Sequence, residues 1–313
     1  MEFFKKLRAH RQAKPIYGAG VLPKQRPASL FRYRNAENLQ FLRPILLDHS
    51  VYAAPIGKGD VFNDPCECFY DIDLSWDEAS ARAGIRYMKS LPPGIRPQVR
   101  KGIEAVGEIK PHELEFFERF WKENDENAIL AIMRAGHNTF SPNMRNALEE
   151  SQRILDQATV GICSLSALGQ SPYMSWSYAG NHRGVCLEFS TGYLPFSNAG
   201  PVIYSENPPT VKLMGNPFQS QINRMMTKGR AWEHEEEWRV FSHPDTGLSI
   251  PFPPPALKSL TFCPFFLNQD DGEQKKKTIL DWLRERKVQH PLGVYEFEIN
   301  RKRYEFSRKP ITL

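Results

Sequence analysis

The sequence predicts an α+β fold, with a mixed or mostly antiparallel split sheet and a helical insert. Short strand-like segments lie on both sides of a long stretch with helical spacing. Strands and helices do not alternate regularly along the chain, and the sequence contains neither a G-x-G-x-x-G motif nor a P-loop. These observations argue against a Rossmann or a P-loop architecture.

The composition is that of an ordinary globular protein. The 313 residues are 41% hydrophobic, and the net charge of +5 permits a phosphate-bearing partner without requiring one. The five cysteines are irregularly spaced, so we expect reduced thiols and no metal site. The charged start does not resemble a signal peptide, and no apolar run is long enough to cross a membrane. We therefore expect a cytoplasmic protein with no membrane contact.

We expect a basic arm or linker over residues 1–29 and a single α+β domain over residues 30–313. Prolines and glycines interrupt the arm, which could contact a partner protein. Helical spacing over about residues 75–157 predicts the insert, which we expect at one side of a cleft. The predicted strands cover residues 30–34, 51–54, 159–166, 185–189, 201–204, 257–262 and 294–299, with 304–306 as a candidate last strand. The predicted helices cover residues 219–228 and 274–286.

The run over residues 231–240, AWEHEEEWRV, is the most unusual stretch of the chain. In a helix its acids would repel one another at i,i+3 and i,i+4 spacing. We therefore expect a strand, in which Glu233, Glu235 and Glu237 share one face. Spaced carboxylates of this kind can carry chemistry where they line a cleft. The alternative is a solvated acidic face between two packing tryptophans.

Several motifs together resemble a widespread bacterial family built on a domain of unknown function. The resemblance covers about residues 30–306 outside the insert and implies no particular activity. The interval between Trp176 and Tyr178 is one residue shorter than the family pattern. The motifs are Tyr33-Arg34, Phe62-Asn63-Asp64-Pro65-x-Glu67, Trp176-x-Tyr178-Ala179, His182-x-Gly184-x-Cys186-Leu187-Glu188-Phe189 and Trp232-x-x-Glu235-x-Glu237-Trp238-Arg239.

A second resemblance is to ADP-ribosyltransferases of the arginine-serine-glutamate type. Arg34, Ser164-Leu165-Ser166 and Glu235-x-Glu237 occur in the order of that family's motifs, on predicted strands. The resemblance implies that NAD is the substrate and that ADP-ribose is transferred to a macromolecular acceptor, a protein or a nucleic acid. The resemblance further implies that the chain is a bacterial toxin or a phage defence effector.

The resemblance implies catalytic roles for Glu237, Glu235 and Ser164. Cleavage of NAD builds positive charge on the ribose, as in glycoside hydrolysis, and a carboxylate stabilises that charge. We assign this role to Glu237, with the Ser164 hydroxyl supporting the ribose or orienting Glu237. Glu235 would orient or deprotonate the acceptor.

The resemblance also implies a set of NAD-binding residues. Arg34 would hold the pyrophosphate in bidentate fashion, and Trp176 or Tyr178 would stack on the nicotinamide. We therefore expect Arg34, Ser164 and Glu237 to line one cleft, and a structure with Glu237 on the opposite side of the sheet from Arg34 would refute the transferase hypothesis that rests on this resemblance. The remaining candidates for NAD binding are Tyr33, Ser166 and His182; His182 equally suits a turn histidine bonded to nearby backbone.

Two alternatives stay open. The chain fits a non-catalytic interaction protein whose acidic strand and basic arm bind a macromolecule. It also fits a metal-dependent nuclease, because divalent cations prefer oxygen ligands, although no Asp/Glu-x-Lys signature supports this alternative. The nuclease ligands would be Asp64, Glu67, Glu188 and Glu235. Glu188 lies in an apolar strand and is alternatively a structural carboxylate held by Arg239 or Arg34.

Overall fold

The computed structural model describes residues 25–56, 64–90, 119–137, 149, 161–212, 216–242, 247–285, 292–303 and 305–312. The chain divides into two compact units: residues 1–23, 57–158 and 205–229 form the first, and residues 24–56, 159–204 and 230–313 form the second. Of the expected arm over residues 1–29, residues 1–24 lie outside the described part.

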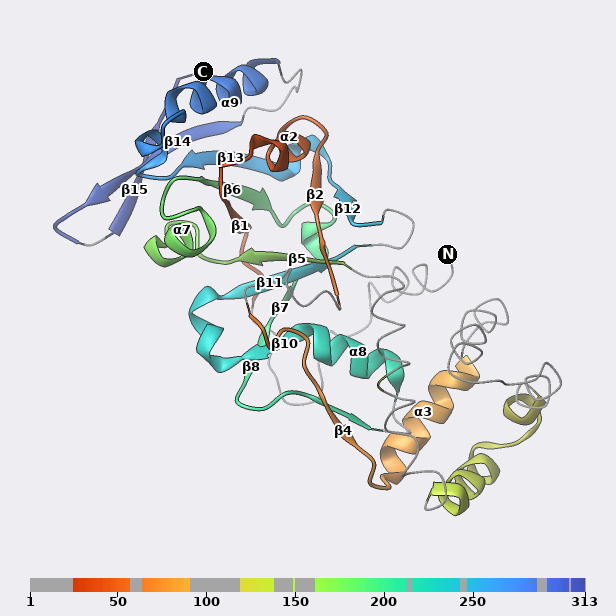
Figure 1. Cartoon of the computed structure of the whole chain (residues 1–313). Helices are drawn as coiled ribbons and strands as arrows, with labels where there is room; N and C mark the ends of the chain where they lie inside the picture. The colour runs from red at the N-terminus through yellow and green to blue at the C-terminus, as the bar shows by residue number, and fades with distance from the viewer. Residues whose placement is uncertain are drawn as a thin grey trace. The chain divides into compact units, whose positions relative to one another are not determined.

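The second unit is built on a nine-stranded sheet (Figure 1). The strand order is β15-β14-β13-β6-β1-β5-β11-β7, and β3 also pairs with β5. Of these pairings, only that of β13 with β14 is parallel. The mostly antiparallel sheet confirms the α+β class. The strands are β1 (Ser29–Arg34), β3 (Ala54–Pro55), β5 (Gly161–Ser166), β6 (Val185–Ser190), β7 (Gly200–Pro201), β11 (Glu237–Phe241), β13 (Leu257–Phe262), β14 (Gly293–Asn300) and β15 (Glu305–Pro310).

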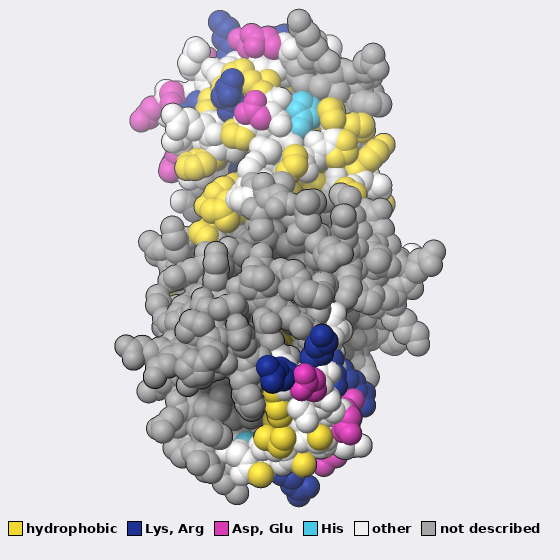
Figure 2. Space-filling model, turned by 90° about the vertical axis from the view of Figure 1, so that its right-hand side faces the viewer, with side chains coloured by type: hydrophobic (Ala, Val, Ile, Leu, Met, Phe, Trp, Pro, Cys, Tyr) yellow, Lys and Arg dark blue, Asp and Glu magenta, His cyan; other side chains and the backbone are white. Residues whose placement is uncertain are grey.

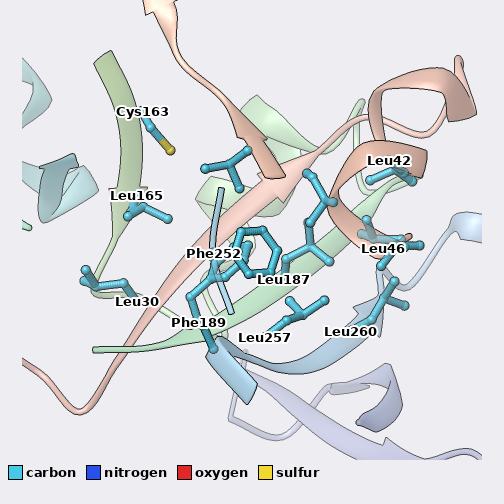
Figure 3. Packing of buried hydrophobic residues seen from close by; sticks show 14 of the residues in the cluster. Leu30, Leu42, Leu46, Cys163, Leu165, Leu187, Phe189, Phe252, Leu257 and Leu260 are labelled. Carbon is cyan, nitrogen blue, oxygen red and sulfur yellow. The ribbon is translucent and has the colours of Figure 1, made fainter. Parts of the chain in front are cut away.

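The two faces of this sheet carry different clusters of buried residues. The larger cluster includes Leu30 of β1, Cys163 of β5 and Trp238 of β11, and it packs under α2 (Arg43–Leu46) and α9 (Gly272–Glu285); Figure 3 shows part of this packing. The smaller cluster includes Tyr33 of β1 and Met174 of α7 (Pro172–Tyr178). Because neighbouring residues of a strand point to opposite faces, membership of these clusters identifies the face of each residue.

Short elements complete the second unit. β2 (Ser50–Tyr52) pairs antiparallel with β12 (Ser249–Pro251). Asn38 caps a 3-10 turn by accepting a hydrogen bond from the Gln40 amide. The 3-10 turns are η2 (Leu39–Phe41), η3 (Phe196–Asn198), η4 (Arg230–Glu235), η6 (Pro254–Ala256) and η7 (Phe266–Asn268).

The first unit contains the parallel pair β4 (Asp71–Asp73) and β9 (Thr210–Lys212). Its helices include α3 (Glu78–Ser90) and α8 (Pro217–Met226), which is followed by β10 (Thr227–Gly229). Residues 119–123 and 126–137 are also helical, so the described part of the predicted insert is helical as expected. The boundary between the second unit and the first falls within β8 (Ile203–Ser205), after Tyr204. Within the described residues, no helix is long and apolar enough to span a membrane.

The expectation of one strand over residues 231–240 is wrong in its first half. Residues Arg230–Glu235 form the 3-10 turn η4, and β11 begins only at Glu237. Glu236, which separates the two elements, has a φ of 45° and cannot continue an extended strand. Its amide donates to the Glu233 carbonyl at 3.2 Å, which closes the turn.

Candidate functional site

The structure places the carboxylates of Glu235 and Glu237 on the same side of the sheet. Glu237 lies directly opposite Ser166 on β5, and its neighbour Trp238 points into the larger core on the other face. Glu235 accepts a hydrogen bond from the hydroxyl of Tyr178, which packs against the smaller cluster. Glu235 is 2% exposed and Glu237 is 5% exposed. We call these two residues the carboxylate pair.

The strained backbone at Glu236 fixes the positions of the two carboxylates relative to each other. A left-handed conformation costs a residue other than glycine about 1–2 kcal/mol, and such strain persists only where the surroundings impose it. The last residue of β5 and the residue directly after it supply that constraint. The Ser166 hydroxyl donates to the Glu235 carbonyl at 2.6 Å, and the Ala167 amide donates to the Glu236 carbonyl at 3.0 Å. Ser166, expected to bind NAD, therefore holds the turn between the two carboxylates.

Arg239 clamps Glu237. Its Nε lies 2.8 Å from one carboxylate oxygen and its Nη2 lies 3.2 Å from the other, and the side chain is 0% exposed. Arg239 lies opposite Ser164 on β5, so Ser164 shares this face of the sheet. The Tyr204 hydroxyl accepts a hydrogen bond from the Glu237 amide at 2.8 Å, and burial raises the pKa of Tyr204 above its usual range.

Arg34 lies on the opposite face of the sheet from the carboxylate pair. It shares its face of β1 with Leu30, which belongs to the larger core, and with Arg32, whose Nη1 donates to the Cys163 sulfur at 2.7 Å. Burial, together with the positive charge of Arg32, lowers the pKa of Arg34 to about 9. The expectation that Arg34, Ser164 and Glu237 line one cleft is therefore wrong. This placement meets the condition set above and refutes the arginine-serine-glutamate assignment.

The structure gives the hydrogen bonds of Tyr33 and the exposure of Trp176, two of the residues expected to bind NAD. The Tyr33 hydroxyl donates to the Leu168 carbonyl at 3.0 Å and accepts from the Ser171 amide at 3.1 Å. This tyrosine therefore ties down the loop that leads into α7. Trp176 lies on α7 with its side chain 56% exposed.

His182 holds the turn that follows α7. Its Nδ1 lies 3.0 Å from the Ser175 hydroxyl, and its ring meets those of Phe265 and Phe306 edge to face. Burial lowers its pKa, and its φ of 66° is left-handed. These contacts fit the alternative of a turn histidine, although its partner is a side chain rather than backbone.

Glu188 is held by four donors on the α7 side of the sheet. Arg308 Nη1 lies 2.8 Å from one carboxylate oxygen of Glu188, and Lys258 Nζ lies 2.9 Å from the other. The hydroxyls of Ser29 and Ser259 donate to these oxygens, each at 2.8 Å. Burial by itself raises the pKa of this carboxyl, but the hydrogen bonds from these donors outweigh it and hold the pKa at about 2. The expected partners, Arg239 and Arg34, were wrong.

The nuclease alternative gains no support from the described residues, among which no group of three candidate metal-binding side chains occurs. Glu188 is engaged as described above. In the first unit, Asp64 accepts a hydrogen bond from the Cys66 amide at 2.9 Å, and Glu67 pairs with Lys228.

Arg239 and Tyr204 are the residues that sequence reasoning missed as partners of Glu237. The spacing Glu237-x-Arg239 within a strand was a usable signal for the first, because it places an acid and a base on one face. Tyr204 carried no such signal. Comparison of the chain with protein-family models, with curated proteins and with solved structures found no match.

Proposed function

We propose that the chain is an NAD-consuming enzyme that transfers ADP-ribose to a macromolecular acceptor, with the carboxylate pair as its catalytic centre. The observation that carries this proposal is the pair itself: two buried carboxylates on one side of the sheet, joined by strained backbone at Glu236. Strain and buried charge are both costly, and both concentrate at functional sites. The proposal does not rest on the arginine-serine-glutamate resemblance, which the position of Arg34 refutes; it rests on the carboxylate pair, and Arg34 has no part in the proposed centre.

The contacts of the two carboxylates suggest a division of roles. Arg239 binds both oxygens of Glu237 and offsets its charge. Tyr178, a neutral phenol, donates a hydrogen bond to a Glu235 carboxylate oxygen and so orients it. We therefore assign to Glu235 the stabilisation of the ribosyl cation, which the sequence had suggested for Glu237. Glu237 becomes a positioning residue, held by Arg239 beside the turn that carries Glu235.

The proposed reaction proceeds by displacement at the ribose. The bond between C1′ and the nicotinamide nitrogen breaks, its electron pair leaves with nicotinamide, and positive charge develops on the ribose. The carboxylate of Glu235 stabilises that charge. The nucleophilic atom of the acceptor then bonds to C1′ and gives its proton to the same carboxylate.

The test compares wild type with Glu235→Gln. We expect the substitution to lower nicotinamide release about 10²–10³-fold, the usual cost of losing one electrostatic contact to a transition state. Glu233→Gln is the matched control, because Glu233 belongs to the same turn, η4, and is exposed. Incorporation of labelled ADP-ribose is measured with cell lysate as acceptor. Equal rates in wild type and Glu235→Gln remove the carboxylate pair from the mechanism.

A result in which the assay detects no NAD turnover bears on the alternative of a non-catalytic interaction protein. Figure 2 shows Lys and Arg side chains beside Asp and Glu side chains on the described surface of that view, rather than an area of one charge sign. A binding surface there would not rely on a single-sign field. Absence of NAD turnover in every preparation would refute the enzyme proposal and favour an interaction protein.

A further inference from the structure

Two arginines of β1 form a cluster of positive charge that the proposed reaction does not use. Arg32 and Arg34 lie two positions apart on one face of the strand, the face that carries Leu30 of the larger core. At this spacing the two residues are about 6.5 Å apart along the strand, so their guanidinium groups can converge on one ligand. Arg32 is 9% exposed, whereas Arg34 is only half-buried and so remains partly open to solvent.

The positive charge of this pair has no acidic partner among the described residues. The side chains that act electrostatically on Arg34 are Arg32, Cys163 and Tyr52, none of which is an aspartate or a glutamate. Burial, with the charge of Arg32 beside it, lowers the pKa of Arg34 to about 9. Buried charges are costly and are normally paired with a charge of opposite sign. An anion bound from solution would supply that missing charge.

The guanidinium of Arg34 also has an unused hydrogen-bond donor. Its Nε is buried and has no hydrogen-bond partner among the described residues. Arg32 is held in place by two bonds, from Nη1 to the Cys163 sulfur at 2.7 Å and from Nη2 to the Tyr52 carbonyl at 2.9 Å, which use two of its five N–H groups. Tyr52 itself is 50% exposed, so solvent reaches this side of the cluster. Because buried donors are nearly always paired in folded proteins, the unpaired Nε indicates a partner that the chain does not supply.

We propose that Arg34, together with Arg32, binds a single oxyanion group. A guanidinium holds two oxygens of a phosphate, a sulfate or a carboxylate through parallel N–H groups, and the second arginine adds charge of the same sign beside it. The two arginines lie on the face of the sheet away from the carboxylate pair. The oxyanion is therefore no part of the NAD contacts in the proposed reaction, and either assignment can fail without the other.

The binding test uses the full chain with sodium phosphate, sodium sulfate or sodium acetate, each compared with sodium chloride at the same ionic strength. We expect the tightest oxyanion to raise the melting temperature by about 5 °C at a hundredfold excess over its dissociation constant. Phosphate and sulfate binding tighter than acetate indicates a tetrahedral ligand, and the reverse order indicates a carboxylate. No rise beyond that in chloride overturns the proposal.

Arg34→Gln separates a ligand site from the general stabilisation that phosphate and sulfate give to folded proteins. We expect this variant to lose most of the rise caused by the oxyanion. In chloride it should melt at or above the temperature of the wild type, because it removes a charge that has no counter-ion. The control is Arg43→Gln, which changes an arginine of α2 that is 56% exposed and pairs with Asp48; it should keep the full rise. An Arg34→Gln variant that keeps the full rise, or that melts well below the wild type in chloride, overturns the proposal.

Arg34→Lys tests the geometry of the contact with the charge kept. It replaces the planar fork by a single point charge, so we expect folded protein that binds the oxyanion at least tenfold more weakly. Circular dichroism establishes the fold of each variant, and calorimetric titration gives the affinity. Affinity equal to that of the wild type in Arg34→Lys contradicts the proposed contact.

Discussion

The ion pair between Glu237 and Arg239 makes Glu237→Gln a test of stability. Glutamine keeps the shape of the side chain and one carbonyl oxygen, but it removes the negative charge beside a guanidinium that is 0% exposed. Removing one partner of a buried ion pair costs about 3–5 kcal/mol. Since glutamine can still accept a hydrogen bond from Arg239 Nε, we expect the lower end of that range, about 3 kcal/mol.

A double-mutant cycle isolates the interaction between the two side chains. Glu237→Gln, Arg239→Met and the double variant are unfolded in urea, and tryptophan fluorescence reports the free energy of unfolding. We expect the double variant to be more stable than the sum of the single effects implies, by about 2 kcal/mol. The control is Glu298→Gln, which disrupts an exposed pair with Lys309 of 3.3 Å and should cost less than about 1 kcal/mol.

Two results would refute this reasoning. A Glu237→Gln variant as stable as the Glu298→Gln control would show that the buried pair contributes little to folding. Additive single effects would show that Glu237 and Arg239 act independently, in spite of the bidentate contact.

Three further predictions follow from single contacts. The Glu188 carboxyl, with its pKa lowered from 4.5 to about 2, should contribute about 2 kcal/mol of stability above pH 4.5, after solvent screening at Lys258. That stability should be lost progressively as the pH falls from about 4.5 to about 2; denaturation at pH 7 and pH 2.5 tests this, and an equal pH slope in Glu188→Gln contradicts it. Glu236→Gly should raise the free energy of unfolding by up to about 1 kcal/mol, because glycine tolerates the φ of 45°; destabilisation in urea would argue against strain there. Tyr178→Phe should lower nicotinamide release about tenfold by removing the hydrogen bond to Glu235, and an unchanged rate would show that this bond does not position the carboxylate.

The buried centre of the sheet was the part most readily predicted from the sequence. The predicted strand over residues 257–262 matches β13, and that over 185–189 matches β6 to within one residue. Both strands lie in the interior of the sheet and are buried along most of their length. Such strands appear in sequence as runs dominated by apolar residues, which are easy to recognise. The helix predicted over residues 274–286 likewise corresponds to α9.

The relation between faces of different strands could not be predicted. Alternation along β1 shows that Leu30 and Arg34 share a face, but Phe31 and Tyr33 make the other face equally apolar. Only the packing of Leu30 with Cys163 and Trp238 shows that Arg34 points away from Glu237. Face assignments of this kind depend on long-range packing, which periodicity within one strand does not contain.

The expectation of a strand over residues 231–240 was wrong for a different reason. Repulsion between its acids excluded a regular helix, and a strand was the remaining regular element. The chain instead forms a 3-10 turn and one left-handed residue, Glu236, held by hydrogen bonds from Ser166 at the end of the distant β5 and from Ala167 directly after it. The sequence therefore predicted Glu235 and Glu237 as site residues, but it did not predict how their carboxylates are arranged.

The measurement that tests the proposed catalytic centre most directly is a crystal structure of the chain with a non-hydrolysable NAD analogue. We predict that the nicotinamide ribose lies on the α7 side of the sheet, with a ribose hydroxyl or the C1′ atom about 3 Å from the Glu235 carboxylate. A ligand on the opposite face, beside Arg34, would contradict the proposed centre, as would the lack of any bound ligand at saturating concentration.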